Sequence, residues 1–151
     1  MKLQPRFCYL IKHADLLGAF ELMRLLRPLL VDACAFATQV QRQSQQHYRL
    51  LGAWLDTELV GLVGFRMLEN LLHGRFVYVD DLVVAQSQRH AGIGAQLLDQ
   101  VRREAIRSAA QHLVLDTGLH MPLAQRFYFR EGLLAKGMHF VQPLPEGPCH
   151  A

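Results

Sequence analysis

Apolar residues change their spacing several times along the first half of the chain. Residues 6–12 predict a first strand. Residues 15–26 place apolar side chains on one helical side and predict a helix that Asp15 caps and Pro28 ends. A second helix is expected over residues 32–46.

From Tyr48 onward the spacing becomes typical of strands. Residues 48–55 and 59–68 are strand-like runs around residues 56–58, which predict a hairpin turn. Residues 75–85 are rich in Val, Phe and Tyr and predict a third strand of the same sheet.

The second half begins with a glycine-containing loop over residues 89–94. One buried helical stripe follows it, formed by Gly94, Leu97, Leu98, Val101 and Ala105. Residues 112–116 predict a strand. Pro122 suits the first turn of a short helix that Gly132 closes, and residues 133–141 predict a last strand.

The predicted order is strand, two helices, three antiparallel strands, helix, strand, helix, strand. It indicates a mixed α/β fold. A chain of 151 residues without repeats or linkers is expected to form one domain, residues 1–151, with residues 143–151 as a flexible tail.

Composition narrows the class of protein. With 51% hydrophobic and 19% charged residues, the chain is too apolar for disorder, and its apolar runs are too short to span a membrane. The first ten residues lack the apolar run of a signal peptide. The chain has three widely spaced cysteines, Cys8, Cys34 and Cys149. This small number and wide spacing argue against a disulfide framework or a metal site and favour a cytoplasmic location.

The basic residues favour an anionic ligand of modest size. The formal charge is +3, and arginine supplies 13 of the 16 basic residues. Arginine binds phosphate well, but these arginines are scattered and form no stripe of the kind that binds nucleic acid. We therefore expect no nucleic-acid partner, although the basic pI keeps a nucleic-acid-directed enzyme as a minor alternative.

The most informative stretch runs from Asp80 through a strand end into a glycine-rich loop and a helix. Such a loop lets backbone N–H groups approach an anion closely, and the helix N-terminus adds partial positive charge. A dinucleotide fingerprint would need a small residue at Leu97, and a P-loop would need Gly-Lys-Ser/Thr, which is absent. A tight turn without a ligand is the structural alternative.

Two blocks of sequence carry a family resemblance. Arg89-x-x-Gly92-x-Gly94, after a strand reading Asp-Asp-Leu-Val-Val, resembles the acyl-CoA-binding signature of the GNAT superfamily of N-acyltransferases. Ala-x-x-Phe-Tyr-x-x-x-Gly, starting at Ala124, resembles a second block of that family, with Leu133 in place of its commoner phenylalanine. The resemblance spans about residues 6–141.

The resemblance implies a mostly antiparallel central sheet, splayed at the cofactor site and flanked by about four helices. It also implies acetyl-CoA as co-substrate and a primary amine of a small molecule or peptide as acceptor. The cofactor-binding residues it implies lie on the strand end and in the loop: Leu82, Val83, Val84, Arg89, His90, Ala91, Gly92, Ile93, Gly94 and Ala95.

Three residues are candidates for catalysis. The resemblance places Tyr128 near the thioester sulfur, and a tyrosine with its usual pKa near 10 can protonate a departing thiolate. Asp80 is the first candidate for the general base and Asp81 the second. Neighbouring strand residues point to opposite faces, so we expect only one of the two to face the acceptor. Either carboxylate could instead bind a cationic acceptor.

One departure from the family pattern keeps other functions open. Met121 stands where many members carry asparagine, so a polar contact is lost or supplied by His120. A non-catalytic acyl-CoA-binding module is therefore an alternative, as is an enzyme that acetylates a protein N-terminus or a lysine. A homodimer is possible, and the sequence does not identify the acceptor.

Overall fold

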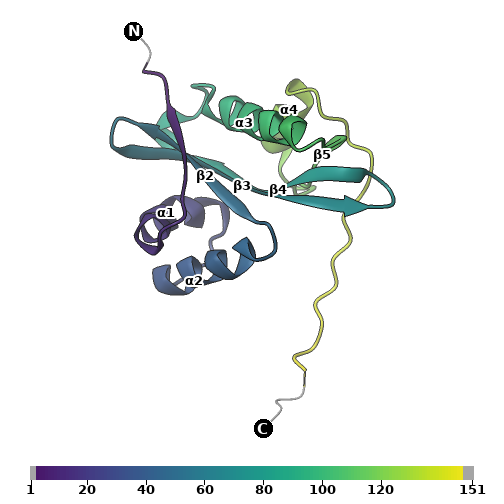
Figure 1. The fold of residues 1–151 in the computed structure, drawn as a ribbon, viewed down its shortest axis with the longest axis horizontal. Coiled ribbons are helices and arrows are strands. Elements are labelled where there is room, and N and C mark those ends of the chain that lie inside the picture. Colours follow the sequence, from purple (N-terminus) through teal and green to yellow (C-terminus); the bar gives the residue numbers. More distant parts are fainter. Residues whose placement is uncertain (1–2, 148–151) are drawn as a thin grey trace. The chain divides into compact units, whose positions relative to one another are not determined.

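The computed structural model describes residues 3–147 (Figure 1). They form two compact units that divide between Leu115 and Asp116. The units are described one at a time. The expectation that residues 1–151 make one domain stays a prediction, and Cys149 lies outside the described residues.

The first unit contains a sheet that has five strands within the described residues. Its order follows the sequence, with antiparallel pairing between the first four strands and a parallel last strand. This agrees with the predicted mixed, mostly antiparallel sheet. The strands are β1 (Arg6–Tyr9), β2 (Arg49–Leu55), β3 (Glu58–Asn70), β4 (Gly74–Val84) and β5 (His112–Leu115).

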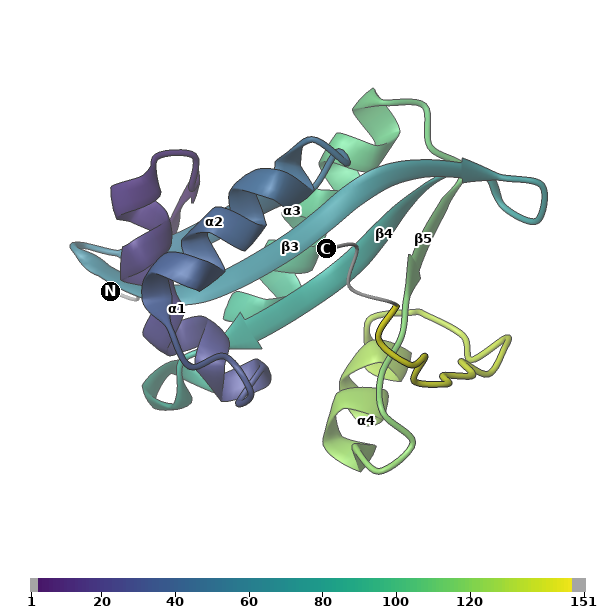
Figure 2. The same cartoon turned by 90° about the horizontal axis from the view of Figure 1, so that it is seen from below.

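Helices cover both faces of this sheet. The helices α1 (His13–Leu26) and α2 (Ala33–Ser44) lie on one face, and α3 (Ile93–Arg107) lies on the other (Figures 1 and 2). The central part of β3 is apolar on both faces, and successive side chains of a strand point to opposite faces. Leu62 packs with α1 and α2, while Val63 lies on the α3 face.

The buried stripe of α3 confirms the predicted helix. Leu97, Leu98 and Val101 have no exposed surface, and Ile93 rather than Gly94 begins the stripe. On the other face, the apolar side of α1 packs against Phe36 and its neighbours on α2, as expected from the spacing.

The predicted cap of the first helix was wrong. Lys12 is the N-cap of α1, and Asp15 lies in the first turn. A carboxylate is also favourable there, because the N-terminal end of a helix carries partial positive charge. The second helix is capped as its sequence indicates, since Asp32 Oδ1 accepts a hydrogen bond of 2.6 Å from the Ala35 N–H.

The second unit holds α4 (Pro122–Arg130), which starts at a proline as predicted. The predicted strand over residues 133–141 was wrong, because residues 133–147 form neither helix nor strand. A strand needs the backbone of a neighbour to bond with, and this unit contains no strand among its described residues. Within residues 3–147, no helix is long and apolar enough to cross a membrane.

We expect Leu97→Ala to lower the free energy of unfolding by about 2–5 kcal/mol, since it leaves a cavity between α3 and the sheet. Ile106→Ala, on the same helix but at a position 76% exposed, should change it by less than about 1 kcal/mol. Urea denaturation of the two variants measures the difference. Equal losses would contradict the burial assigned to α3.

Candidate functional site

The sheet opens at the end of β4. Pairing between β4 and β5 stops at Val79 and Leu115, whereas β3 stays paired with β4 as far as Val84. Residues 80–84 therefore have no strand partner on the β5 side among the described residues. This leaves a free backbone edge where the family resemblance implied that the sheet splays.

A β-bulge lies at the same point. Gly64 pairs with Asp81 and Phe65 pairs with Val79, so Asp80 is an extra residue on β4. A bulge interrupts the alternation of side chains along a strand. As a result Asp80 and Asp81 both line one cavity on the α1/α2 face. The expectation that only one of them would face that side was wrong, because it assumed a regular strand.

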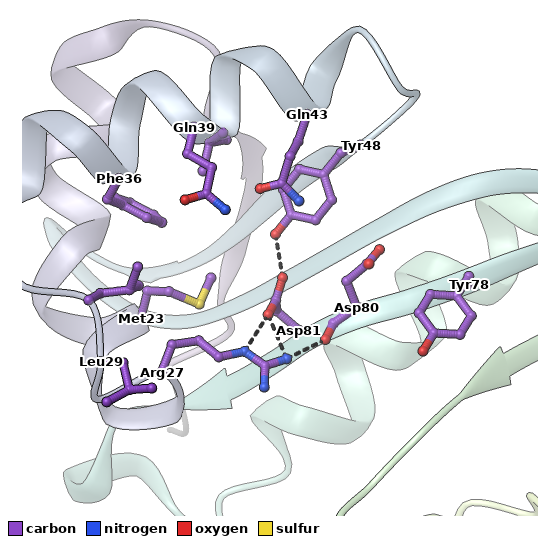
Figure 3. A pocket seen from close by; sticks show the side chains of 12 residues that line it. Met23, Arg27, Leu29, Phe36, Gln39, Gln43, Tyr48, Tyr78, Asp80 and Asp81 are labelled. Carbon is purple, nitrogen blue, oxygen red and sulfur yellow. Dashed lines mark hydrogen bonds and ion pairs between the residues drawn. The ribbon is translucent and has the colours of Figure 1, made fainter. Parts of the chain in front are cut away.

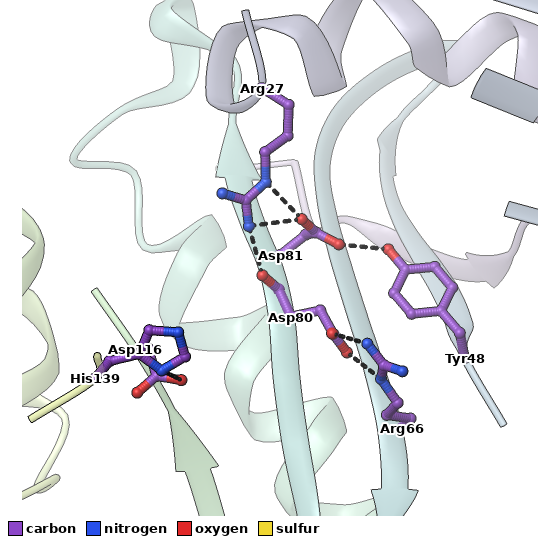
Figure 4. A network of polar contacts seen from close by, with 7 residues as sticks. All are labelled: Arg27, Tyr48, Arg66, Asp80, Asp81, Asp116 and His139. Atoms are coloured by element: carbon purple, nitrogen blue, oxygen red, sulfur yellow. Dashed lines mark hydrogen bonds and ion pairs between the residues drawn. The ribbon is translucent and has the colours of Figure 1, made fainter. Parts of the chain in front are cut away.

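Asp80 is held by an arginine of the neighbouring strand. Arg66 Nε donates to Asp80 Oδ2 at 3.0 Å, and Arg66 Nη2 donates to Oδ1 (Figure 4). Both partners are largely covered, with 23% and 14% of their side chains exposed. The hydrogen bond to Asp80 raises the pKa of the Arg66 guanidinium. This two-point contact fixes the carboxylate in position.

Asp81 is held from two other elements. Arg27, at the C-terminal end of α1, donates from Nε to Oδ1 at 2.9 Å, and Tyr48 Oη donates to Oδ2 at 2.7 Å (Figure 4). Arg27 Nη2 also donates to the main-chain oxygen of Asp80 at 2.8 Å. Burial, and after it the charge of Asp81, raises the pKa of Tyr48 well above 10. Tyr48 is therefore a hydrogen-bond donor at neutral pH.

A glycine makes the Tyr48 contact possible. Gly64 lies on β3 directly under the tyrosine ring, and a Cβ atom there would come within 1.9 Å of Tyr48 Oη. Only a residue without a side chain leaves room for the hydroxyl to reach Asp81.

A cavity of about 410 Å³ lies between α1, α2 and the bulge (Figure 3). One side is apolar, and the carboxylates and two glutamine amides face it from the other sides. The volume suits a small ligand or part of a larger one. The lining residues are Met23, Arg27, Leu29, Leu30, Phe36, Gln39, Val40, Gln43, Tyr48, Tyr78, Asp80 and Asp81.

The glycine-rich loop follows β4 through a short 3₁₀ turn, Gln86–Gln88. Gly92 has φ +83° and is the N-cap of α3, a conformation that favours glycine. The first N–H that bonds into the helix is that of Gln96, to Gly92 O. The amides of residues 92–95 have no backbone acceptor in the described chain, so they suit an anion.

The structure thus places Asp80 and Asp81 next to residues 82–84 at the end of β4, and a short 3₁₀ turn connects this strand end to the glycine-rich loop.

Tyr128 belongs to the second unit, where it lies half-buried on α4 with its ring 5.2 Å from that of Phe127. Its main-chain oxygen accepts a hydrogen bond from the Leu133 N–H. Its role as a proton donor stays a prediction. Met121 is the N-cap of α4 and 39% exposed.

Sequence reasoning missed four residues of the site: Arg27, Gly64, Tyr48 and Arg66. A glycine within an apolar strand is a signal of close approach, and Gly64 could have been singled out on that ground. The other three are common polar residues, and nothing in their local sequence marks them. No group of three or more His, Cys, Asp or Glu residues that could hold a metal ion occurs in the described part.

The sequence matches the model of the acetyltransferase (GNAT) family over residues 18–132. The chain belongs to this family. No curated protein matches it in sequence. The match to the family model confirms the resemblance drawn from the two sequence blocks.

Solved structures of acetyltransferases share the fold. A ribosomal-protein-alanine N-acetyltransferase from Brucella melitensis biovar Abortus 2308 is 22% identical, with a TM-score of 0.79 over 93% of this chain and 99% of that one. AAC(6')-Iy, bound to a bisubstrate analogue that contains CoA, is 18% identical with a TM-score of 0.78 over the same shares. An aminoglycoside acetyltransferase from an uncultured soil metagenomic sample, solved with sisomicin, is 15% identical with a TM-score of 0.77 over 93% and 97%.

Gly64→Ala should lower the free energy of unfolding by about 1–3 kcal/mol, because the methyl group displaces the Tyr48 ring and breaks its hydrogen bond to Asp81. Gly18→Ala is the matched control. It lies within α1 with open space around it, so alanine should stabilise the helix by up to about 1 kcal/mol. Thermal unfolding of both variants measures the two changes in stability, which should have opposite signs. An unchanged stability in Gly64→Ala would contradict the close approach of the Tyr48 hydroxyl to Gly64.

Proposed function

We propose that this protein is an N-acetyltransferase that transfers the acetyl group of acetyl-CoA directly to a primary amine of a small molecule or peptide. The single observation that carries the proposal is the cavity that holds Asp80 and Asp81 at the point where β4 loses its strand partner. Membership of the acetyltransferase family supports the reaction class.

The cofactor fits the strand end and the loop. The free backbone edge of Leu82, Val83 and Val84 offers N–H and C=O groups that would bond the amide groups of the pantetheine arm as a further strand would. The loop from Arg89 through His90 and Ala91, with the N–H groups of residues 92–95, would hold the pyrophosphate. When bound, acetyl-CoA supplies the activated acetyl group.

The chain's own groups account for the remaining steps. A backbone N–H of residues 82–84 would donate to the thioester oxygen as negative charge develops on it. Tyr128 would give its proton to the leaving sulfur. Asp80 is the first candidate to take the proton of the amine, and Asp81 the second. Both carboxylates already accept hydrogen bonds from arginine, so we expect the proton to pass through a water molecule.

We also propose a cytoplasmic location, supported by the few cysteines, of which Cys8 and Cys34 are free thiols. A homodimer, which the family resemblance also implied, stays a prediction.

Gly94→Glu should abolish acetyl-CoA binding, because it places a bulky carboxylate among amides that would bind an anion. Ile106→Glu is the control: it adds the same charge to the same helix at an exposed position near the other end. Titration calorimetry with acetyl-CoA measures both. Binding that is unchanged in Gly94→Glu, or absent from the folded wild-type protein, would overturn the assignment of the loop.

Tyr128→Phe should lower kcat by about 10²–10⁴-fold if the hydroxyl is the general acid. Acetyl-CoA affinity and the thermal midpoint should stay the same, since only one hydroxyl is removed. Tyr9→Phe, which changes a tyrosine on β1, should leave kcat unaltered. A kcat that does not fall would contradict the role of Tyr128 as general acid. A non-catalytic acyl-CoA-binding module would be favoured if turnover stays slow over a broad panel of amines and does not change in Tyr128→Phe.

A further inference from the structure

The charges around the cavity cancel. Asp80 is paired with Arg66, and Asp81 with Arg27, each through hydrogen bonds of a guanidinium group. Arg27, Asp80 and Asp81 are the only charged residues that line the cavity within the described chain. Both carboxylates are 14% exposed and already neutralised. The site therefore offers no unpaired negative charge to a cationic ligand.

The opposite wall is apolar. Met23 of α1 and Phe36 of α2 are buried side chains that face the cavity (Figure 3). The buried Val40 of α2 also lines it. Leu29, in the connection between these helices, also lines it and is 93% exposed. A charged group placed against this wall would lose its hydration without gaining a partner, whereas an apolar group would cover Leu29.

The two glutamines of the cavity are uncharged hydrogen-bonding groups. Gln39 and Gln43 are four residues apart on α2 and so project from the same side of the helix, toward the cavity (Figure 3). Among the described residues, neither side-chain amide has a hydrogen-bond partner. Each offers a donor and an acceptor, which suits an amide or hydroxyl group of a ligand.

From these three features we propose that the acceptor is a monoamine, with one primary amine on an apolar body that carries an uncharged polar group such as an amide. This inference rests on the proposed function and names its substrate class. A monoamine is neutral once it has lost the proton that must leave before attack. A polyamine or aminoglycoside keeps further ammonium groups, which would meet Arg27 and the apolar wall.

The first test compares acceptors. With wild-type protein, kcat/KM for L-leucinamide should exceed that for glycinamide by about tenfold, because the leucine side chain buries apolar surface. It should exceed that for spermidine, a trication, by at least about tenfold. A value for spermidine equal to or above that for leucinamide would overturn the inference and leave the acetyltransferase proposal standing. Failure to acetylate any amine would overturn both.

The second test changes the charge of the cavity. Gln39→Glu with Gln43→Glu adds two unpaired carboxylates and should raise kcat/KM for spermidine by about tenfold, the effect of two partly exposed ion pairs. Gln41→Glu is the control, since it adds charge to the same helix at an exposed residue outside the cavity. An equal rise in the control, or no rise in the double variant, would overturn the inference.

The third test removes the apolar contact. Leu29→Ser should reduce the preference for leucinamide over glycinamide to about threefold or less, while Val31→Ser, 86% exposed in the same connection but outside the cavity, should keep it. Both side chains are exposed, so neither variant is expected to unfold the protein. A preference that survives Leu29→Ser unchanged would overturn the apolar part of the inference.

Discussion

The bulge at Asp80 is the constraint on which the site depends. One extra residue on β4 turns two consecutive carboxylates to the same face of the sheet. The pairing with β5 ends one residue earlier, at Val79. Because a bulge bends a strand and increases its twist, the same feature accounts for the loss of the neighbour and the exposed backbone edge. The proposed acceptor cavity and the proposed cofactor-binding edge thus share one origin.

Two carboxylates side by side in a partly covered site repel each other and lose hydration, so each requires a partner. Each partner comes from a different part of the chain: Arg66 lies on β3, Arg27 caps the end of α1, and Tyr48 immediately precedes β2. Removing one partner would leave a charge uncompensated, which is more damaging than replacing the whole pair. The network therefore determines where the end of α1 lies relative to β4.

Much of the fold could be predicted from the sequence, because helical and strand periodicity are local properties. The stripe on α3, the hairpin between β2 and β3 and the loop at Gly92 all follow from residues close together in the chain. The predicted strand over residues 133–141 failed for the complementary reason: alternation shows that a segment can form a strand, and a strand also needs a neighbour. Asp15 failed as a cap because the helix begins two residues earlier.

The geometry of the site could not be predicted, because it depends on contacts between distant residues. Arg27 and Asp81 are 54 positions apart, and Tyr48 and Asp81 are 33 apart. The sequence identified the two aspartates but assigned them to opposite faces, since the register of β3 against β4 decides where the bulge lies. Once that register is known, the pairing of both carboxylates follows from the desolvation they would otherwise suffer. The Arg27–Asp81 pair holds the end of α1 against β4, and together with the Arg66–Asp80 pair it leaves the proposed acceptor cavity without net charge. The stability of the fold and the proposed selectivity of the site thus depend on the same side chains.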